Sequence, residues 1–340
     1  MVADIDLYEL LENVHPANKN QLTADCPYCQ KGDGHFFIKK KTDEIDKRGN
    51  NKSYQFRCLK CNEEGGLYTL LKHLDRLDLV KVFRDTSIFS EKLLKINLSN
   101  LTKTIVRFDE NSLYLQEQAL PTGFKRLHSD EYLENRGITP EDFEKYKFGS
   151  SKILSRYKDR IILLIEERGK CVGYIARSKK TKEEVQALKI RGIKHARYLN
   201  SVSDFGKMLF GYEEIQRGKT NTVIAVEGVF DKFNVTKLLN LYHDSELKCV
   251  ACFGKKISDE QIHKLQIAGV KNIVLMFDPD AYKDTFKYAF ELSKYFNVLV
   301  AKLTECDPGD ITLDQLMDVL DNLQSPLEFG LNTINNIILK

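Results

Sequence analysis

The stretch NIVLMFDPDA, residues 272–281, starts as an apolar run and ends on an acid, a proline and a second acid. Five consecutive apolar residues, 273–277, are typical of a strand buried on both faces. Open α/β sheets bind ligands at the carboxyl ends of their strands, where Asp278 and Asp280 would lie. The two acids therefore either cap a turn or hold a metal ion, and the flanking sequence has to decide between these readings.

Strand-like and helix-like segments alternate around this stretch. Strands are predicted at TVIAVE (222–227), KCVACF (248–253) and NVLVAKL (297–303), and segments with helical patterns separate them. Strands that alternate with helices favour a parallel sheet covered on both faces. The fold class predicted for this half of the chain is therefore α/β.

Acidic residues follow several of these strands. Glu227 ends the first strand, Asp231 lies in the first turn of the next helix, and Asp307 and Asp310 follow the last strand. Because the carboxyl ends of parallel strands meet at one edge, we expect these carboxylates to converge with those of residues 278 and 280. Carboxylates without nearby histidine or cysteine select Mg²⁺ or Mn²⁺ and support phosphoryl transfer. Taken singly, each acid could still be a turn or cap residue.

Two cysteine pairs lie near the N-terminus. Cys26-Pro-Tyr-Cys29 and Cys58-Leu-Lys-Cys61 are separated by 28 residues. Two such pairs close a tetrahedral shell of four sulfurs, which leaves no open position and predicts one structural zinc ion. A third pair, Cys249 and Cys252, falls within a predicted buried strand and is interpreted as packing.

The segment between the zinc-ligand pairs alternates aromatic and basic residues, at HFFIKKK (35–41) and SYQFR (53–57). Such strands suit single-stranded nucleic acid, with bases stacked on the rings and phosphates bound by residues such as Lys39 and Arg57. The alternative is that about half of the aromatic residues form the core of a small zinc ribbon. The four rings concerned are Phe36, Phe37, Tyr54 and Phe56.

Positive charge is concentrated in the middle of the chain. Residues 151–220 contain 17 Lys and Arg against 8 Asp and Glu, although the 340-residue chain has a net charge of only +3. This distribution favours a local surface for a polyanion, although a solvated basic face is the plainer alternative. The segments 160–167 and 170–178 predict a β-hairpin around Arg168-Gly169.

The sequence contains no apolar run long enough to span a membrane, and the acidic N-terminus is unlike a signal peptide. We therefore expect a cytoplasmic protein with reduced thiols and without a membrane partner.

A zinc ribbon, a basic region and a sheet bearing Glu and Asp-x-Asp occur here in the order found in DnaG-type primases. CPYC…FRCLKC with EEGGLYTLL resembles their zinc-binding domain, and YLENRGITPEDFEKYKFG resembles the start of their RNA polymerase domain. DRIILLIEERGKCVGYIAR and ARYLNS are similar to its basic subdomain, and VEGVFD, FDPDA and DPGD to its Toprim module. The resemblance, which covers roughly residues 5 to 310, implies a multidomain α/β protein: a zinc-binding domain (1–80), a linker (81–120), a basic mixed α+β subdomain (121–220) and a Toprim catalytic subdomain (221–310). The last thirty residues, 311–340, have the pattern of a helical tail.

The resemblance also implies an activity, the Mg²⁺-dependent synthesis of short RNA primers on single-stranded DNA from ribonucleoside triphosphates. Glu227, Asp278 and Asp280 would bind the catalytic ions, assisted by Asp231, Asp307 and Asp310. Arg160, Arg197 and Asn200 match positions that contact the template and the incoming nucleotide. The spacer between the cysteine pairs is longer than in the family, and Asp310 lies one residue later than in the commoner motif. The short chain resembles bacteriophage primases that work beside a separate helicase, which implies a bacterial or phage-infected cytoplasm.

Other proteins use the same acids differently. A type IA topoisomerase needs a nucleophilic tyrosine and a much longer chain, and a Toprim nuclease would lack the zinc ribbon. A RecR-like recombination protein combines zinc and Toprim without catalysis, but its zinc motif is compact and it lacks a basic region such as 151–220.

Overall fold

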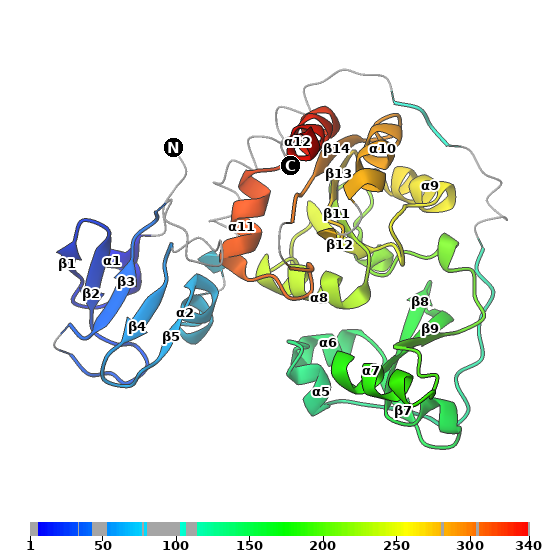
Figure 1. Cartoon of the computed structure of the whole chain (residues 1–340), viewed down its shortest axis with the longest axis horizontal. Helices are drawn as coiled ribbons and strands as arrows, with labels where there is room; N and C mark the ends of the chain where they lie inside the picture. The colour runs from blue at the N-terminus through cyan, green and yellow to red at the C-terminus, as the bar shows by residue number, and fades with distance from the viewer. Residues whose placement is uncertain are drawn as a thin grey trace.

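A computed structural model describes residues 6–32, 34–42, 53–76, 78–79, 103–106, 114–279, 282–303 and 306–338. These residues form three sheets with flanking helices, a mixed α/β architecture of several parts (Figure 1). The predicted multidomain α/β class is therefore confirmed.

The N-terminal sheet is antiparallel, in the order β1-β2-β3-β4-β5. Its strands are β1 (His15–Asn18), β2 (Gln21–Ala24), β3 (Phe36–Lys39), β4 (Phe56–Cys58) and β5 (Glu64–Gly65), and it is accompanied by α1 (Leu7–Leu10) and α2 (Leu67–His73). Phe36, Tyr54 and Phe56 are buried, whereas Phe37 is only partly buried. Three of the four aromatic rings therefore belong to the core, and the proposed stacking face is reduced to one ring.

The middle sheet is also antiparallel, in the order β10-β9-β8-β7-β6. It comprises β6 (Phe124–Arg126), β7 (Phe148–Ser151), β8 (Arg160–Glu167), β9 (Lys170–Ser178) and β10 (Tyr198–Asn200), with α5 (Glu131–Glu134), α6 (Pro140–Lys145) and α7 (Lys182–Ile190). The hairpin predicted around Arg168-Gly169 is confirmed, because β8 pairs with β9 and both turn residues have positive φ. Two consecutive residues with positive φ are the geometry of tight hairpin turns.

The third sheet is parallel, in the order β12-β11-β13-β14. Its strands are β11 (Thr222–Val226), β12 (Leu247–Ala251), β13 (Asn272–Leu275) and β14 (Asn297–Val300). Between them lie α8 (Val229–Leu238), α9 (Asp259–Ala268) and α10 (Tyr282–Leu292), which cover the sheet in Figure 1. The strands are buried almost throughout, as expected for a parallel sheet with two covered faces.

The C-terminal segment is helical as predicted, and its helices pack against the rest of the chain. Helices α11 (Leu313–Asp321) and α12 (Pro326–Ile338) follow the last strand, and α12 packs against α10 and β14. Leu313, Leu316, Met317 and Leu320 on α11 are buried in the same core as the zinc-ribbon residues. Figure 1 shows α11 beside α2, between the N-terminal sheet and the parallel sheet.

The contact between α11 and α2 includes a buried carboxylate. A Cβ atom built on Gly66, which begins α2, would lie 2.7 Å from Oδ2 of Asp314. Burial raises the pKa of Asp314 to about 7. The junction with the zinc ribbon therefore includes a carboxyl group whose charged form is disfavoured.

A buried ion-pair network joins the middle sheet to α8. Lys232 has no exposed side-chain surface, and its Nζ donates to Glu214 and to the hydroxyl of Tyr146. Lys145 pairs with the other oxygen of Glu214 at 3.1 Å. Burial opposes ionisation of Glu214, but the ammonium groups of Lys232 and Lys145 outweigh it and lower the pKa of this carboxyl. The network thus stays charged and fixes α8 against the segment before β7.

The predicted linker, 81–120, lies largely outside the described residues, as do residues 43–52 of the spacer between the cysteine pairs. The described parts of the linker contact the parallel-sheet domain and then β9. Thr104 donates to the carbonyl of Lys294 at 2.7 Å, and Gln118 to that of Cys171 at the same distance. Among the helices that the structure describes, none has the length and apolar character of a membrane span.

Candidate functional site

The four predicted zinc ligands form a compact thiolate cluster. Within the described residues, only Cys26, Cys29, Cys58 and Cys61 form a metal-competent group, with ligand atoms all within 4.8 Å of one another. The Sγ atoms of residues 26 and 61 are 3.8 Å apart, and those of 29 and 58 are 4.0 Å apart. A tetrahedral ion with Zn–S bonds of about 2.3 Å requires sulfurs about 3.8 Å apart, so the cluster fits a zinc ribbon.

One thiol of the cluster is prepared to ionise. Burial alone would raise the pKa of Cys58, but the backbone N–H groups of Cys61 and Lys60 counter it and bring the value to about 7. The Lys60 N–H lies 3.4 Å from the sulfur. Thiolates are the metal-binding form of cysteine, so this backbone geometry favours a bound cation. Cys249 and Cys252, by contrast, are buried packing residues, as predicted.

The predicted acids come together at the carboxyl edge of the parallel sheet. Glu227 directly follows β11, and its Oε1 accepts the backbone N–H of Asp278, which follows β13, at 3.1 Å. Asp231 lies in the first turn of α8, and Asp307 follows β14. All four border one cavity of about 390 Å³, and Asp310 lines it as well. Asp280 lies outside the described residues.

Asp231 is held in a narrow cradle. Its Oδ2 accepts the backbone N–H of Gly228 at 2.9 Å, as the cap of α8. A Cβ on Gly228 would lie 2.8 Å from this carboxylate, and one on Gly309 only 2.6 Å from it. A side chain at either glycine would therefore push the Asp231 carboxylate aside, and one of the two, Gly309, belongs to the DPGD motif.

The neighbouring carboxylates raise the proton affinity of Asp231. Burial, followed by the negative charge of Asp278, raises the pKa of Asp231 to about 7, and Asp307 and Glu227 add to this effect. The Gly228 N–H acts in the opposite direction. Oxygen ligands gathered in this way suit a hard divalent cation, and a cation would relieve the repulsion. The oxygen donors therefore suit Mg²⁺ or Mn²⁺ rather than a softer metal, but within the described residues no three of them lie as close together as the four sulfurs do.

The opposite wall of the cavity belongs to the middle sheet and is cationic. Strand β10 pairs with β9, with Tyr198 opposite Arg177 and Asn200 opposite Ile175. These four residues line the cavity, together with Arg197. The predicted residues Arg197 and Asn200 thus line the same cavity as the acids, and Arg177, which was not predicted as a site residue, lines it as well.

Two guanidinium groups contact an aromatic ring on α8. Arg177 lies 4.4 Å and Arg136 5.5 Å from the centroid of Phe230, which is on α8 beside Asp231. Arg177 also donates to the hydroxyl groups of Tyr132 and Tyr198. Sequence reasoning missed Arg136 and Phe230 as cavity residues, and the only signal was their position inside the quoted motifs YLENRG and VEGVFD.

Arg160 uses its guanidinium group for contacts inside the protein rather than at the cavity. It does not line the cavity, whereas Arg177, which is equally buried at 5% exposed, does. Its guanidinium donates to the carbonyls of Arg156, Ala176 and Ala196, the last at 2.8 Å. It therefore ties the chain before β10 to the middle sheet.

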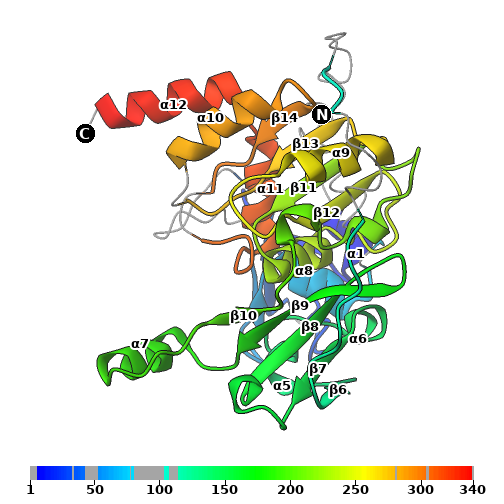
Figure 2. The ribbon, with the colours of Figure 1, turned by 90° about the vertical axis from the view of Figure 1, so that its right-hand side faces the viewer.

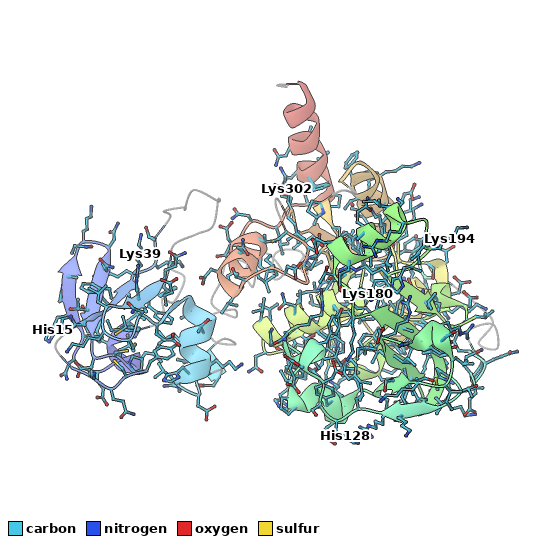
Figure 3. All side chains as sticks on the ribbon, turned by 60° about the horizontal axis from the view of Figure 1, so that its bottom comes forward. His15, Lys39, His128, Lys180, Lys194 and Lys302 are labelled. Carbon is cyan, nitrogen blue, oxygen red and sulfur yellow. The ribbon has the colours of Figure 1, made fainter. Side chains whose placement is uncertain are left out.

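Lys39 and Arg57 lie on the zinc ribbon and are absent from the cavity lining. Arg57 is opposite Phe37 in the β3–β4 pair and also lies 3.7 Å from Glu64. Figure 3 places Lys39 on the N-terminal sheet, apart from Lys180 on the middle domain. Any contact of Lys39 or Arg57 with nucleic acid would thus lie outside the cavity.

The fold and site define a class of protein. It is a multidomain α/β protein with a thiolate metal cluster and a separate cavity in which oxygen ligands face arginines. Such a cavity can bind a divalent cation together with a phosphate-bearing ligand, because the two walls carry opposite charge.

Comparison with known proteins finds similarity to DNA primases. The chain is 24% identical over 297 residues to a DNA primase of Thermotoga maritima, covering 72% of this chain and 48% of that protein. The chain thus spans about half the length of the curated relative that it matches. No family model matches.

Two solved structures are also similar. The RNA polymerase domain of Mycobacterium tuberculosis primase DnaG is 18% identical, with 60% of this chain and 69% of that chain covered and a TM-score of 0.41. The primase fragment of the bacteriophage T7 primase-helicase protein is 15% identical, with 78% and 91% covered and a TM-score of 0.37.

Proposed function

We propose that this chain is a DNA primase, which makes short RNA primers on a single-stranded DNA template from ribonucleoside triphosphates. The observation that carries the proposal is the cavity in which Glu227, Asp231, Asp278 and Asp307 face Arg177, Arg197 and Asn200. The similarity to a DNA primase along 72% of the chain supports it.

The acidic wall would hold the catalytic cations. Glu227, Asp278 and Asp307 supply carboxylate oxygens, Asp231 joins them from α8, and Asp310 lies at the rim. The sequence assigns Asp280 to the same group. When bound, Mg²⁺ or Mn²⁺ would supply charge neutralisation for nucleotidyl transfer from a triphosphate to a 3′-hydroxyl.

The basic wall would bind and orient the nucleotide and the template. Arg177 is fixed by the hydroxyls of Tyr132 and Tyr198 and by the face of Phe230, so its guanidinium is positioned before a ligand arrives. A preorganised arginine binds phosphate oxygens with little loss of side-chain freedom. Asn200 borders the same cavity from β10, and Arg197 borders it from the position just before that strand.

The thiolate cluster would bind one structural zinc ion and so hold the N-terminal ribbon together. Four sulfur ligands complete the tetrahedral shell, which leaves no position for a reacting water. The ribbon would then contribute to template choice through its exposed face, where Phe37, Lys39 and Arg57 lie. A separate replicative helicase would be the partner that delivers the template.

The test is a primer-synthesis assay with a panel of single-stranded templates, labelled ribonucleotides and Mg²⁺ or Mn²⁺. Asp278→Asn removes one carboxylate charge and should lower the rate by on the order of 100-fold or more, because metal-held charge is worth several kcal/mol. Glu291→Gln, an exposed acid on α10, is the matched control and should be neutral. If wild type makes primers and Asp278→Asn makes them equally well, the role proposed for the cavity is refuted.

A second outcome separates the alternatives. If wild type binds single-stranded DNA but makes no oligoribonucleotide on any template, with or without a helicase, the catalytic proposal fails. A non-catalytic DNA-binding role would then be the better interpretation of the same fold.

A further inference from the structure

A helical arm projects from the middle sheet between β9 and β10. We define the arm as residues 179–197, with α7 at its centre. Figure 2 shows α7 extending away from the rest of the chain, joined to it through β9 and β10. Its residues are mostly exposed, including Ile190 at 78% and Ile193 at 50%.

The arm is strongly positive. It contains seven Lys and Arg and two Asp and Glu. Both acids, Glu183 and Glu184, lie in the first turn of α7, where Glu184 completes the helix cap with Thr181. The far end of the helix therefore carries only positive charge.

Three exposed cations surround the point where α7 ends. Lys189 is in the last turn, Arg191 follows the helix, and Lys194 comes after Gly192, which turns the chain with φ of +74°. None of the three cationic side chains forms an ion pair within the part of the chain that the structure describes. Lys179, at the start of the arm, differs because it pairs with Asp130 at 2.6 Å.

The base of the arm is fixed to the wall of the cavity. Ser178 donates to the carbonyl of Arg197 at 2.9 Å, and the Ser178 hydroxyl and His195 lie 2.7 Å apart. Buried Arg160 donates to the carbonyls of Ala196 and Arg197. Because the same strands carry the arm and the cationic wall, the arm keeps a defined direction relative to the cavity.

We propose that this arm binds the sugar–phosphate backbone of a nucleic acid strand that occupies the cavity, at a point beyond the reacting groups. The inference rests on the proposed function for the identity of that strand, but its binding step can be measured alone. The three cations around the end of α7 retain the template or the template–primer duplex and take no part in bond formation, unlike Arg197 at the base of the arm, which lines the cavity.

The chemistry favours a nucleic acid backbone over other partners. A phosphate backbone offers evenly spaced negative charge and no requirement for a fitted apolar surface, which matches separated cations on a protruding helix. Ile190 and Ile193 lie among these cations and can contact sugars or base faces. A protein partner would instead need a contiguous apolar patch of the kind that stable interfaces bury.

The test compares two triple variants of the full-length, zinc-loaded protein. Lys189→Gln/Arg191→Gln/Lys194→Gln removes three charges from the arm. Lys219→Gln/Lys271→Gln/Lys294→Gln removes three exposed charges near the amino-terminal edge of the parallel sheet, opposite the cavity. Fluorescence anisotropy with labelled single-stranded DNA and with an RNA–DNA duplex carrying a template overhang gives Kd as a function of salt.

The arm variant should bind about 10- to 100-fold more weakly at about 0.1 M salt, and its salt slope should fall by about 2, because each lost contact removes roughly 0.7. Primer synthesis at saturating template should keep the wild-type rate. The edge variant should match wild type in both measurements.

Equal affinities and salt slopes for the arm and edge variants would overturn the proposal, whatever the result of the primer assay. Absence of primer synthesis by wild type, with a selective binding loss in the arm variant, would refute the primase activity and leave the arm as a nucleic-acid-binding element. A lower synthesis rate of the arm variant at saturating template would show that the arm acts in the reaction, and would also overturn the proposal.

Discussion

Replacing Lys232 should destabilise the joined middle and parallel-sheet domains. Its ammonium group is fully buried and pairs with Glu214, which is itself 6% exposed. Lys232→Met keeps the volume and the apolar stem of the side chain but removes the charge and leaves Tyr146 and Glu214 without this donor. Removing one partner of a buried pair costs about 3–5 kcal/mol.

The lower end of that range applies, because Lys145 still pairs with Glu214 at 3.1 Å after the change. A cooperative unit of roughly 200 residues unfolds with an entropy of about 0.4 kcal/mol per kelvin, so a loss of about 3 kcal/mol lowers Tm by about 7 °C. Circular dichroism or differential scanning calorimetry on the zinc-loaded protein measures this shift. Lys287→Met, on the exposed surface of α10, is the control and should change Tm by about 1 °C at most.

A double variant tests the physical reason for the loss. In Lys232→Met/Glu214→Gln the buried carboxylate charge, which Lys145 alone still offsets in Lys232→Met, is gone, so the double variant should be more stable than Lys232→Met alone. The reasoning is refuted if Lys232→Met behaves like Lys287→Met. It is equally refuted if Glu214→Gln adds a full, independent destabilisation in the double variant, because two residues in one network cannot act independently.

Three other changes have clear expected outcomes. Cys58→Ser should lower zinc content well below one ion per chain and unfold the N-terminal ribbon, as measured by metal analysis and proteolysis; an unchanged zinc content would contradict the ligand assignment. Asp314→Asn should raise Tm more at pH 8 than at pH 4.5: the folded-state pKa near 7 exceeds the unfolded value near 4, so the carboxyl destabilises the fold increasingly as pH rises through that window, and equal shifts at both pH values would contradict this sign. Gly309→Ala should displace Asp231 and lower primer synthesis by about 10-fold or more, whereas Gly254→Ala, which lines the same cavity but whose Cβ meets nothing within 4 Å, should be nearly neutral; similar activities would contradict the cradle around Asp231.

The parallel sheet and its acidic edge were predictable from sequence because both depend on local signals. Apolar runs specify the strands, and the carboxyl ends of parallel strands share an edge whatever the details of packing. The hairpin of the middle sheet was predictable for the same reason, because Arg168-Gly169 separates two strand-like runs. Asp231 was placed correctly near the edge because the first turn of a helix follows closely from the end of a strand.

The cationic wall was harder to predict because it depends on the contact between two sheets. Arg136 and Arg177 are separated from Asp278 by more than a hundred residues of sequence, and nothing local indicates that they face the same cavity. Cross-strand register likewise decides which side of the ribbon each aromatic ring occupies, so Phe36 and Phe56 are core residues although their spacing resembles a stacking surface. Arg160 shows the same limitation, because its buried guanidinium group donates to backbone carbonyls instead of binding a ligand.

The integration of the C-terminal helices did have a signal in the sequence. Leu313, Leu316, Met317 and Leu320 follow the i, i+3, i+4, i+7 spacing of a helix that buries one face. This spacing predicts a core helix rather than a tail, and the buried face packs toward α2 of the zinc ribbon.

The register of β9 fixes the composition of the cavity. Ile175 packs toward the parallel-sheet domain and Arg177 lines the cavity, whereas Tyr174 and Ala176 pack in a separate cluster on the opposite face of the strand. A slip of one residue would exchange these two sets, removing the arginine from the cavity. The ladder between β8 and β9 is regular along this part, and its irregularity lies between Ile165 and Glu166, near the hairpin turn. The bulge therefore lies away from the cavity and leaves the register of β9 at the cavity unchanged. Strand β9, which positions the cationic wall, also gives the arm a fixed base.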